Sequence, residues 1–222
     1  MMNKEVRSLE FEIRAEETGS EKRAGRLTGT PIVFDQETDM GWYREVIDRD
    51  ALLECDLKDV KFLIGHDTTG IPLARSRNNN ENSTMQLTVT DRGMEIRVDL
   101  DTENNPRAKE LYSAVSRGDI SGMSFMFVVD KDAWEDIDTE CPKRTILSIR
   151  KVFEVSAVAF PAYPQTDLQA ASEGESLDSV KASLESARKA AEEEREREAE
   201  AERRTAVLER LKKLTEVSDD EV

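Results

Sequence analysis

Residues Gly118 to Val129 read GDISGMSFMFVV, and residues Lys151 to Pro161 read KVFEVSAVAFP. Both stretches are apolar runs interrupted by polar side chains at alternating positions, the two-residue period of a β-strand. We therefore expect two strands here, separated by an acidic loop that contains Trp134. Their serine and glutamate side chains interrupt otherwise apolar faces, so these strands also carry the polar groups of greatest interest.

Other segments add more strands and few helices. Alternation predicts one strand through Leu9, Phe11 and Ile13, and further strands are expected over 27–34, 60–64, 85–89 and 94–100. Gly93 favours a hairpin between the last two. A short helix is expected near 50–57, and a longer one starts at Asn105-Pro106 and ends at Gly118. The pattern favours a mainly β, α+β fold: an antiparallel barrel or curled sheet with a few helices around it.

His66 is the single histidine, and it follows the apolar run that ends at Ile64. Histidine is the side chain whose unperturbed pKa lies near neutrality, so imidazole-based proton transfer has to use this residue. A serine and a histidine are the minimum pair for covalent acyl transfer, and Ser121 and Ser124 are the candidates. The alternatives are an ordinary hydrogen-bonded histidine at a strand end and a buried serine that bonds to a backbone carbonyl.

Glu154 interrupts an apolar face that, by alternation, also contains Val152, Ser156 and Val158. A carboxylate in such a setting needs a partner, because burying it unpaired is costly. That partner is either an arginine or backbone donor, or else His66, and the pattern alone favours neither.

The bulk properties exclude several functional classes. The chain has 222 residues and a net charge of −16, which disfavours non-specific binding to nucleic acid or to anionic membranes. No apolar run reaches the roughly 20 residues needed to cross a bilayer, and the N-terminus lacks a signal-peptide core, so we expect a soluble intracellular protein. Cys55 and Cys141 are isolated, and the glycines form no phosphate-binding loop. We expect no metal and no cofactor.

The composition changes after Pro164. Apolar residues then recur at three- and four-residue steps, at Leu177, Val180 and Leu184, and residues 192–204 are almost wholly Glu, Arg and Ala. We expect a folded domain over 1–168 and an acidic, helical or coiled-coil tail over 169–222. The tail is either a solvent-exposed helix stabilised by side-chain pairs or a weak coiled coil.

Several of these segments occur together and in order between about residues 6 and 168. They are GTPIVF over 29–34, EVID over 45–48, LIGHD and IPLAR over 63–75, the Gly93 hairpin, GDISGMSFMF over 118–127 and EVSAVAFPAYP over 154–164. In this combination the chain resembles the prohead maturation proteases of tailed bacteriophages. The resemblance implies a serine protease similar in fold to the herpesvirus assemblins, with a closed antiparallel barrel ringed by helices.

The resemblance also implies roles for individual residues. It places the histidine base at His66 and the nucleophile at Ser124, with Ser121 as a neighbour, and the acidic third member at Glu154. Asp67 adjoins the histidine and is poorly directed toward its ring. The chain departs from the family pattern at Ala74 and Met126, where glycine is frequent, and these two positions bear on the shape of the pocket.

The function implied is cleavage of scaffolding segments, and of the protease itself, during procapsid maturation. The expected partners are the phage major capsid protein or scaffolding protein as substrate, with self-association through the tail and no nucleic acid or membrane. The expected location is the assembling procapsid in the cytoplasm of the bacterial host. The alternative is a catalytically inactive assembly or scaffolding protein that uses the barrel and tail for interaction. An unrelated esterase is disfavoured because a Gly-x-Ser-x-Gly elbow is missing.

Overall fold

A computed structural model of the protein describes residues 4–9, 13–16, 25–159 and 170–219. The chain separates into two compact units, Met1–Lys181 and Ala182–Val222. The first unit contains two β-sheets and one complete helix. The fold of the described residues is therefore α+β and mainly β, which confirms the expected class.

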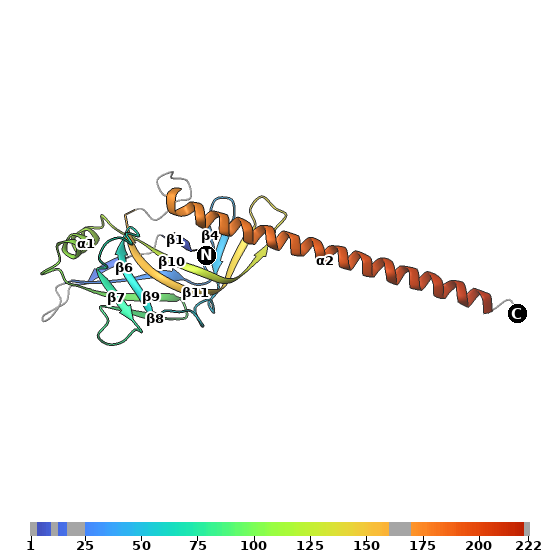
Figure 1. Ribbon diagram of the computed structural model, residues 1–222, viewed down its shortest axis with the longest axis horizontal. Helices are drawn as coiled ribbons and strands as arrows, with labels where there is room; N and C mark the ends of the chain where they lie inside the picture. Colours follow the sequence, from blue (N-terminus) through green and yellow to red (C-terminus); the bar gives the residue numbers. More distant parts are fainter. Residues whose placement is uncertain (1–3, 10–12, 17–24, 160–169, 220–222) are drawn as a thin grey trace. The chain divides into compact units, whose positions relative to one another are not determined.

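The first sheet has seven strands (Figure 1). It contains Ser124 and Glu154, and His66 follows directly after one of its strands. Its strands are β1 (Glu5–Leu9), β4 (Thr38–Asp39), β5 (Arg44–Ile47), β6 (Asp59–Ile64), β7 (Ala74–Arg77), β10 (Gly122–Glu135) and β11 (Lys143–Val158). Their order is β1-β10-β11-β5-β4, and β6 also pairs with β11 and with β7. The long strand β11 pairs with two further strands along its length. Its first residues pair with β5, and its residues 154–157 pair with β6.

The second sheet has four antiparallel strands in the order β2-β3-β9-β8. They are β2 (Ile13–Glu16), β3 (Gly25–Val33), β8 (Met85–Val89) and β9 (Gly93–Leu100). The hairpin of β8 and β9 confirms the sequence prediction. Gly93 is required there by close packing as well as by the turn, because a Cβ on it would lie 2.0 Å from the Ile32 carbonyl oxygen.

The core lies where the two sheets face each other. The first sheet contributes Phe62, Phe125, Phe127 and Val155, and the second contributes Leu27, Ile32, Met94 and Val98, all of them buried. Phe125 and Phe127 stack with ring centroids 4.8 Å apart. These side chains alternate along each strand with residues of the opposite face, so residues 124 and 126 of β10 point away from this core.

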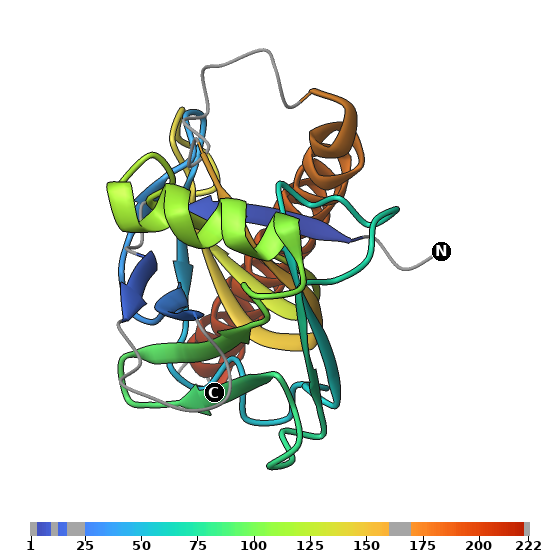
Figure 2. The ribbon, with the colours of Figure 1, turned by 90° about the vertical axis from the view of Figure 1, so that its left-hand side faces the viewer.

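The helix α1 (Pro106–Arg117) forms as the sequence predicts. The Asn105 side chain accepts hydrogen bonds from the backbone N–H groups of Arg107 and Ala108, and Gly118 ends the helix with a left-handed φ of 78°. The buried residues of α1 are Ala108, Leu111 and Val115. In Figure 2 the helix lies across one end of the strands, where it packs on β2, β3 and β9.

Four expectations need correction. The first sheet is mixed rather than antiparallel, because β5 and β6 both run parallel to β11. The strands form two sheets, and no ladder joins these into a closed barrel among the described residues. The strand expected through Leu9 and Ile13 is two strands in different sheets, with residues 10–12 outside the described residues. Trp134 lies within β10 rather than in a loop.

The short helix expected near 50–57 is also absent. Residues 49–54 form successive turns, with three-residue hydrogen bonds such as Ala51 N to Asp48 O at 3.0 Å. The Asp48 carboxylate accepts from the Asp50 N–H at 2.8 Å. Side chains of this type compete with the helical pattern of backbone bonds, which explains why the segment stays a series of turns.

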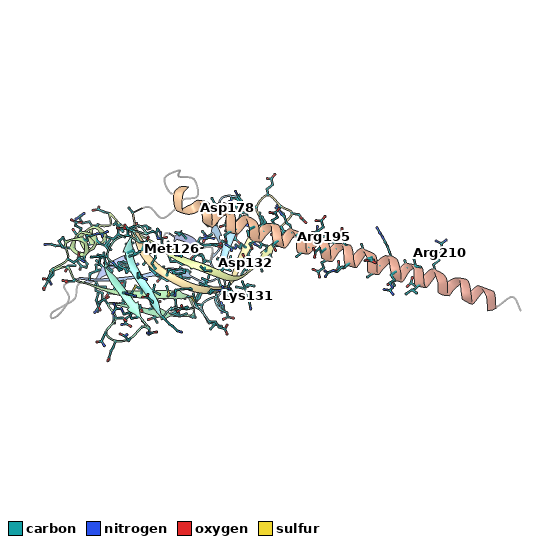
Figure 3. The ribbon with its side chains drawn as sticks, in the orientation of Figure 1. Met126, Lys131, Asp132, Asp178, Arg195 and Arg210 are labelled. Atoms are coloured by element: carbon teal, nitrogen blue, oxygen red, sulfur yellow. The ribbon has the colours of Figure 1, made fainter. Side chains whose placement is uncertain are left out.

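The final helix, α2, spans Ala170–Asp219 and confirms that the C-terminal segment is helical. Every side chain from Glu192 to Arg210 is exposed (Figure 3 labels Arg195 and Arg210). Arg197 and Glu193 form an i, i+4 ion pair at 3.8 Å, as expected of a solvated helix. Nothing in the described residues indicates a coiled coil. No helix in the described part of the chain is long and apolar enough to cross a membrane.

Candidate active site

His66 lies in a tight turn directly after β6. Gly65 and His66 both have left-handed backbone conformations, with φ of 58° and 61°. For a residue other than glycine this conformation costs on the order of 1–3 kcal/mol, so surrounding bonds have to hold it. The Gly65 N–H donates to the Ala157 carbonyl at 3.0 Å, and the His66 N–H donates to Ser156 Oγ at 3.1 Å. Both bonds tie the turn to β11.

The imidazole of His66 contacts the carboxylate of Glu154. His66 Nδ1 lies 2.7 Å from Glu154 Oε1, and the exposed fractions of the two side chains are 15% and 2%. The sequence left open whether Glu154 binds an arginine or backbone donor, or else His66; in the structure it binds His66. A carboxylate bound to Nδ1 favours the tautomer with the proton on Nδ1, because an ionised carboxylate only accepts hydrogen bonds. The lone pair of that tautomer lies on Nε2.

A β-bulge in β11 brings Glu154 to this position. Met126 pairs with Glu154 and Phe127 pairs with Val152, so Phe153 is an extra residue opposite the junction. Simple alternation placed Val152 and Glu154 on one face, and that prediction was wrong. Val152 instead joins the core, and Glu154 points to the opposite face with Met126. Because of the bulge, the Glu154 carboxylate and the apolar Val152 side chain lie on opposite faces of the sheet.

Ser124 lies on the neighbouring strand, directly opposite Ser156. Residues that face each other in a pair of strands project from the same side of the sheet, so the side of Ser124 and Ser156 is also that of Glu154, two residues away. Ser124 is fully buried, and its hydroxyl donates to the Arg7 carbonyl of β1 at 2.9 Å. His66 Nε2 is buried, with no hydrogen-bond partner among the described residues. The structure thus joins His66 to Glu154 and places Ser124 on the adjacent strand.

The other polar candidates point elsewhere. Asp67 accepts hydrogen bonds from the Thr69 hydroxyl at 2.7 Å and the Gly70 N–H at 3.1 Å, and it pairs with Arg107 at 3.3 Å. These bonds lower the pKa of the Asp67 carboxyl, and its side chain does not bind the imidazole. Ser121 is exposed and precedes β10. Burial raises the pKa of the Cys55 thiol to about 12, which opposes a thiolate there.

A buried cluster of charged residues fixes β1, the strand whose carbonyl binds Ser124. Arg7 pairs with Glu45 and, at 2.6 Å, with Glu5, and Arg144 binds Glu5 at 2.7 Å and Asp132 at 2.7 Å. Burial alone would raise the pKa of Glu5, but the adjacent Arg144 and Arg7 guanidinium groups lower it overall. The sequence did not predict this cluster. Glu5 and Arg7 lie at alternate positions of the strand, the pattern that charged residues on a solvent-exposed face also show.

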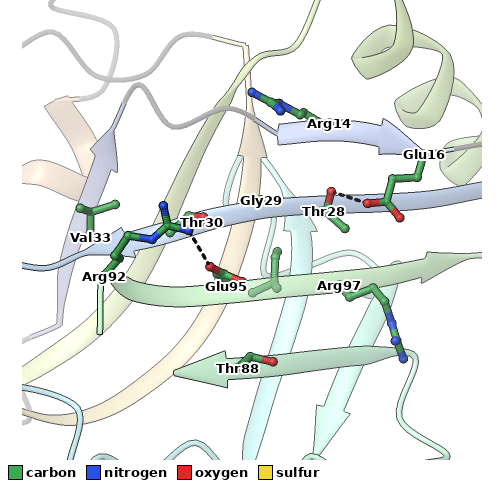
Figure 4. A pocket seen from close by; sticks show the side chains of 11 residues that line it. Arg14, Glu16, Thr28, Gly29, Thr30, Val33, Thr88, Arg92, Glu95 and Arg97 are labelled. Atoms are coloured by element: carbon green, nitrogen blue, oxygen red, sulfur yellow. Dashed lines mark hydrogen bonds and ion pairs between the residues drawn. The ribbon is translucent and has the colours of Figure 1, made fainter. Parts of the chain in front are cut away.

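A hollow lies on the second sheet, and neither His66 nor Glu154 lines it (Figure 4). It has a volume of about 790 Å³ and is lined by residues such as Arg14, Arg92 and Arg97. Its acidic groups bind neighbours, since Glu16 accepts from Thr28 at 3.2 Å and Glu95 pairs with Arg92 at 3.6 Å. No group of His, Cys, Asp or Glu side chains suited to hold a metal ion occurs among the described residues.

Comparison with known proteins identifies a family for the chain. The model of the family described as caudovirus prohead serine protease matches residues 9–182. This range contains His66, Ser124 and Glu154. No curated protein and no solved structure matches the chain.

Proposed function

The chain belongs to the caudovirus prohead serine protease family, and on this premise we propose that it is a serine endopeptidase with Ser124 as nucleophile, His66 as general base and Glu154 as the acid that orients the base. The observation that carries the proposal is the His66–Glu154 pair, with an Nδ1–Oε1 distance of 2.7 Å and an Nε2 that no described residue binds. A base needs an available lone pair and a fixed ring, and this arrangement supplies both.

The first chemical step requires a rotation of the Ser124 side chain. Its hydroxyl turns from the Arg7 carbonyl to His66 Nε2, which accepts the proton while Oγ attacks the carbonyl carbon of the peptide. Glu154 stabilises the imidazolium that results. The imidazolium then gives the proton to the leaving amine, and the C–N bond breaks to leave an acyl-enzyme. Water, deprotonated by the same imidazole, hydrolyses this ester and restores Ser124.

The proposed substrates are proteins of the procapsid. A prohead protease acts within the procapsid, so capsid proteins are the substrates that the family implies. We extend this to scaffolding segments and to the protease itself. The tail is then either a segment that recruits the enzyme into the assembling shell, with self-association through α2, or an extension that self-cleavage removes. The assembling shell in the cytoplasm of the host cell is the proposed site of action.

The assignment is tested with Ser124→Ala and the matched control Ser121→Ala. Ser124→Ala is expected to abolish both self-cleavage and labelling by a fluorophosphonate probe, because it removes the attacking oxygen. Its melting temperature should change little, since one hydroxyl is lost. Ser121→Ala should retain both activities. Mass spectrometry of the intact protein detects the cleavage products, and labelling that persists in Ser124→Ala would contradict the assignment.

One observation favours the second candidate, an inactive assembly protein. In the structure the Ser124 hydroxyl is bonded to the Arg7 carbonyl, the type of bond that any buried serine makes. If the wild-type protein neither cleaves itself nor reacts with the probe when procapsid proteins are present, the assembly role is the correct one.

A further inference from the structure

We infer that Ser156 is a positioning residue that holds both the general base and its acid in place. This inference rests on the proposed function and adds a fourth residue to its machinery. Ser156 lies in β11, two residues after Glu154, and is fully buried. It did not stand out in the sequence, because a serine in an apolar strand resembles any small core residue.

The Ser156 hydroxyl makes two hydrogen bonds to the proposed catalytic residues. It donates to Glu154 Oε2 at 2.5 Å and accepts from the backbone N–H of His66 at 3.1 Å. A hydroxyl has one proton, and a backbone N–H can only donate, so the direction of both bonds is fixed. Ser156 therefore connects the acid to the backbone of the base independently of the contact between their side chains.

The first bond fixes the carboxylate of Glu154. Oε1 faces His66 Nδ1 at 2.7 Å and Oε2 receives the Ser156 proton, so both oxygens have defined partners. A carboxylate held at one oxygen alone is free to rotate about its last side-chain bond. Held at both, it keeps Oε1 directed at the imidazole and maintains the tautomer that leaves Nε2 as the base.

The second bond holds the unusual backbone of His66. The turn contains two successive left-handed residues, Gly65 and His66, and the His66 N–H donates to Ser156. Without this acceptor the N–H would lose its partner in a partly buried turn. The position of the ring relative to Ser124 would then be less well defined, and displacements of about 1 Å in such sites cost on the order of 100-fold in rate.

The location of Ser156 explains how one residue serves both functions. It is the register partner of Ser124 on one side and of Leu63, three residues before His66, on the other. It therefore lies in the middle strand of β10, β11 and β6. Ser124 is in β10, Glu154 is in β11, and His66 follows the end of β6. No other residue type of this size offers both a donor and an acceptor at one oxygen, except threonine.

The test uses the full chain with Ser156→Ala, Ser156→Thr and the control Ser76→Ala. Ser76 is also a fully buried strand serine, but its hydroxyl has no hydrogen-bond partner among the described residues. The readout is the rate of labelling by a fluorophosphonate at saturating and limiting probe, from about pH 5 to about pH 9, together with the melting temperature. This probe reacts with the nucleophile directly and needs no knowledge of the cleavage sequence.

We expect Ser156→Ala to lower the maximal labelling rate about 10- to 100-fold, with the probe concentration for half-saturation unchanged, because Ser156 acts through Glu154 and His66. Ser156→Thr should recover most of the rate, and Ser76→Ala should match the wild type.

Three outcomes would overturn the inference. The first is a Ser156→Ala maximal labelling rate within twofold of that of the wild type. The second is an equal loss in Ser76→Ala, which would indicate a general packing effect. The third is attachment of the probe to Ser156 in the wild type, which would make it the nucleophile. If His66→Ala and Ser124→Ala also label normally, the proposed function fails as well. If they do not label while Ser156→Ala does, only the positioning role is wrong.

Discussion

Replacing Glu154 by glutamine tests the proposed mechanism most directly, because it removes a charge and changes almost no volume. In the protein both carboxylate oxygens accept, Oε1 from His66 Nδ1 and Oε2 from Ser156. A glutamine offers an acceptor at only one of these positions. If its NH₂ faces Nδ1, the imidazole is held with the proton on Nε2 and cannot act as a base. If its oxygen faces Nδ1, the tautomer is kept but the imidazolium loses its counter-charge.

Either orientation lowers the rate of the chemical step by about 10²- to 10⁴-fold, which corresponds to about 3–5 kcal/mol in the activation free energy. The loss of a charge-assisted hydrogen bond should lower the free energy of unfolding by about 1–3 kcal/mol, so the variant is expected to fold.

The assay is the rate of fluorophosphonate labelling and of self-cleavage, expressed per folded molecule. Asp67→Asn is the matched control, since it removes the carboxylate next to His66 in sequence, whose bonds go to Thr69, Gly70 and Arg107. It should keep its activity within about twofold. If Glu154→Gln remained as active as the wild type while Asp67→Asn lost activity, Asp67 would be the acidic member and the reasoning above would be refuted.

Three further predictions concern stability. Glu5 has a lowered pKa in the folded protein, so its stabilising contribution is present above its unfolded value of 4.5 and is lost as the pH falls through the folded value. Glu5→Gln should therefore lower the neutral-pH unfolding free energy by about 3–5 kcal/mol and flatten the dependence of the melting temperature on acidic pH; an unchanged acid profile would contradict this. Gly93→Ala should destabilise by about 1–3 kcal/mol in denaturant titrations, since its Cβ would overlap the Ile32 carbonyl; a neutral effect would show that β3 moves freely. Truncation after Ala191 should leave the melting temperature unchanged, because every side chain from Glu192 to Arg210 is exposed. Truncation at 169 should lower it, because that also removes Ser179, which donates to Glu5 at 3.3 Å, and the buried Val180 and Leu184. Equal melting temperatures for the two truncations would exclude a structural role for the segment between the two cuts.

The elements that the sequence predicted well are those determined by neighbouring residues. The helix after Asn105 has its cap, its proline and its terminal glycine within fourteen residues, and the hairpin around Gly93 is equally local. The pairing of β5 and β6 with β11 was not predictable in this way, because it joins segments about a hundred residues apart and alternation does not specify the partner or the direction.

The same distinction applies to the candidate site. His66 and Glu154 were identified as chemically unusual in their segments, and their contact is present in the structure. The bulge at Phe153 could not be foreseen, since a single extra residue leaves the composition unchanged while it reverses the face of Val152. Ser156 and the Glu5–Arg7–Arg144 cluster were missed because their significance lies in partners from other strands.

The distribution of the candidate site over distant strands also determines when the proposed activity can arise during the life of the chain. The bonds that assemble it join residues separated by 88 positions, for His66 and Glu154, and by 117 positions, for Arg7 and Ser124. Contacts of such long range form late and slowly in folding, after the loops between them have closed. A chain still emerging from the ribosome lacks β11, and therefore both Glu154 and Ser156, until most of its length has been synthesised. The proposed nucleophile and base are thus translated before Glu154 and Ser156, the two residues proposed to orient the base, so a chain that ends before β11 lacks a complete site.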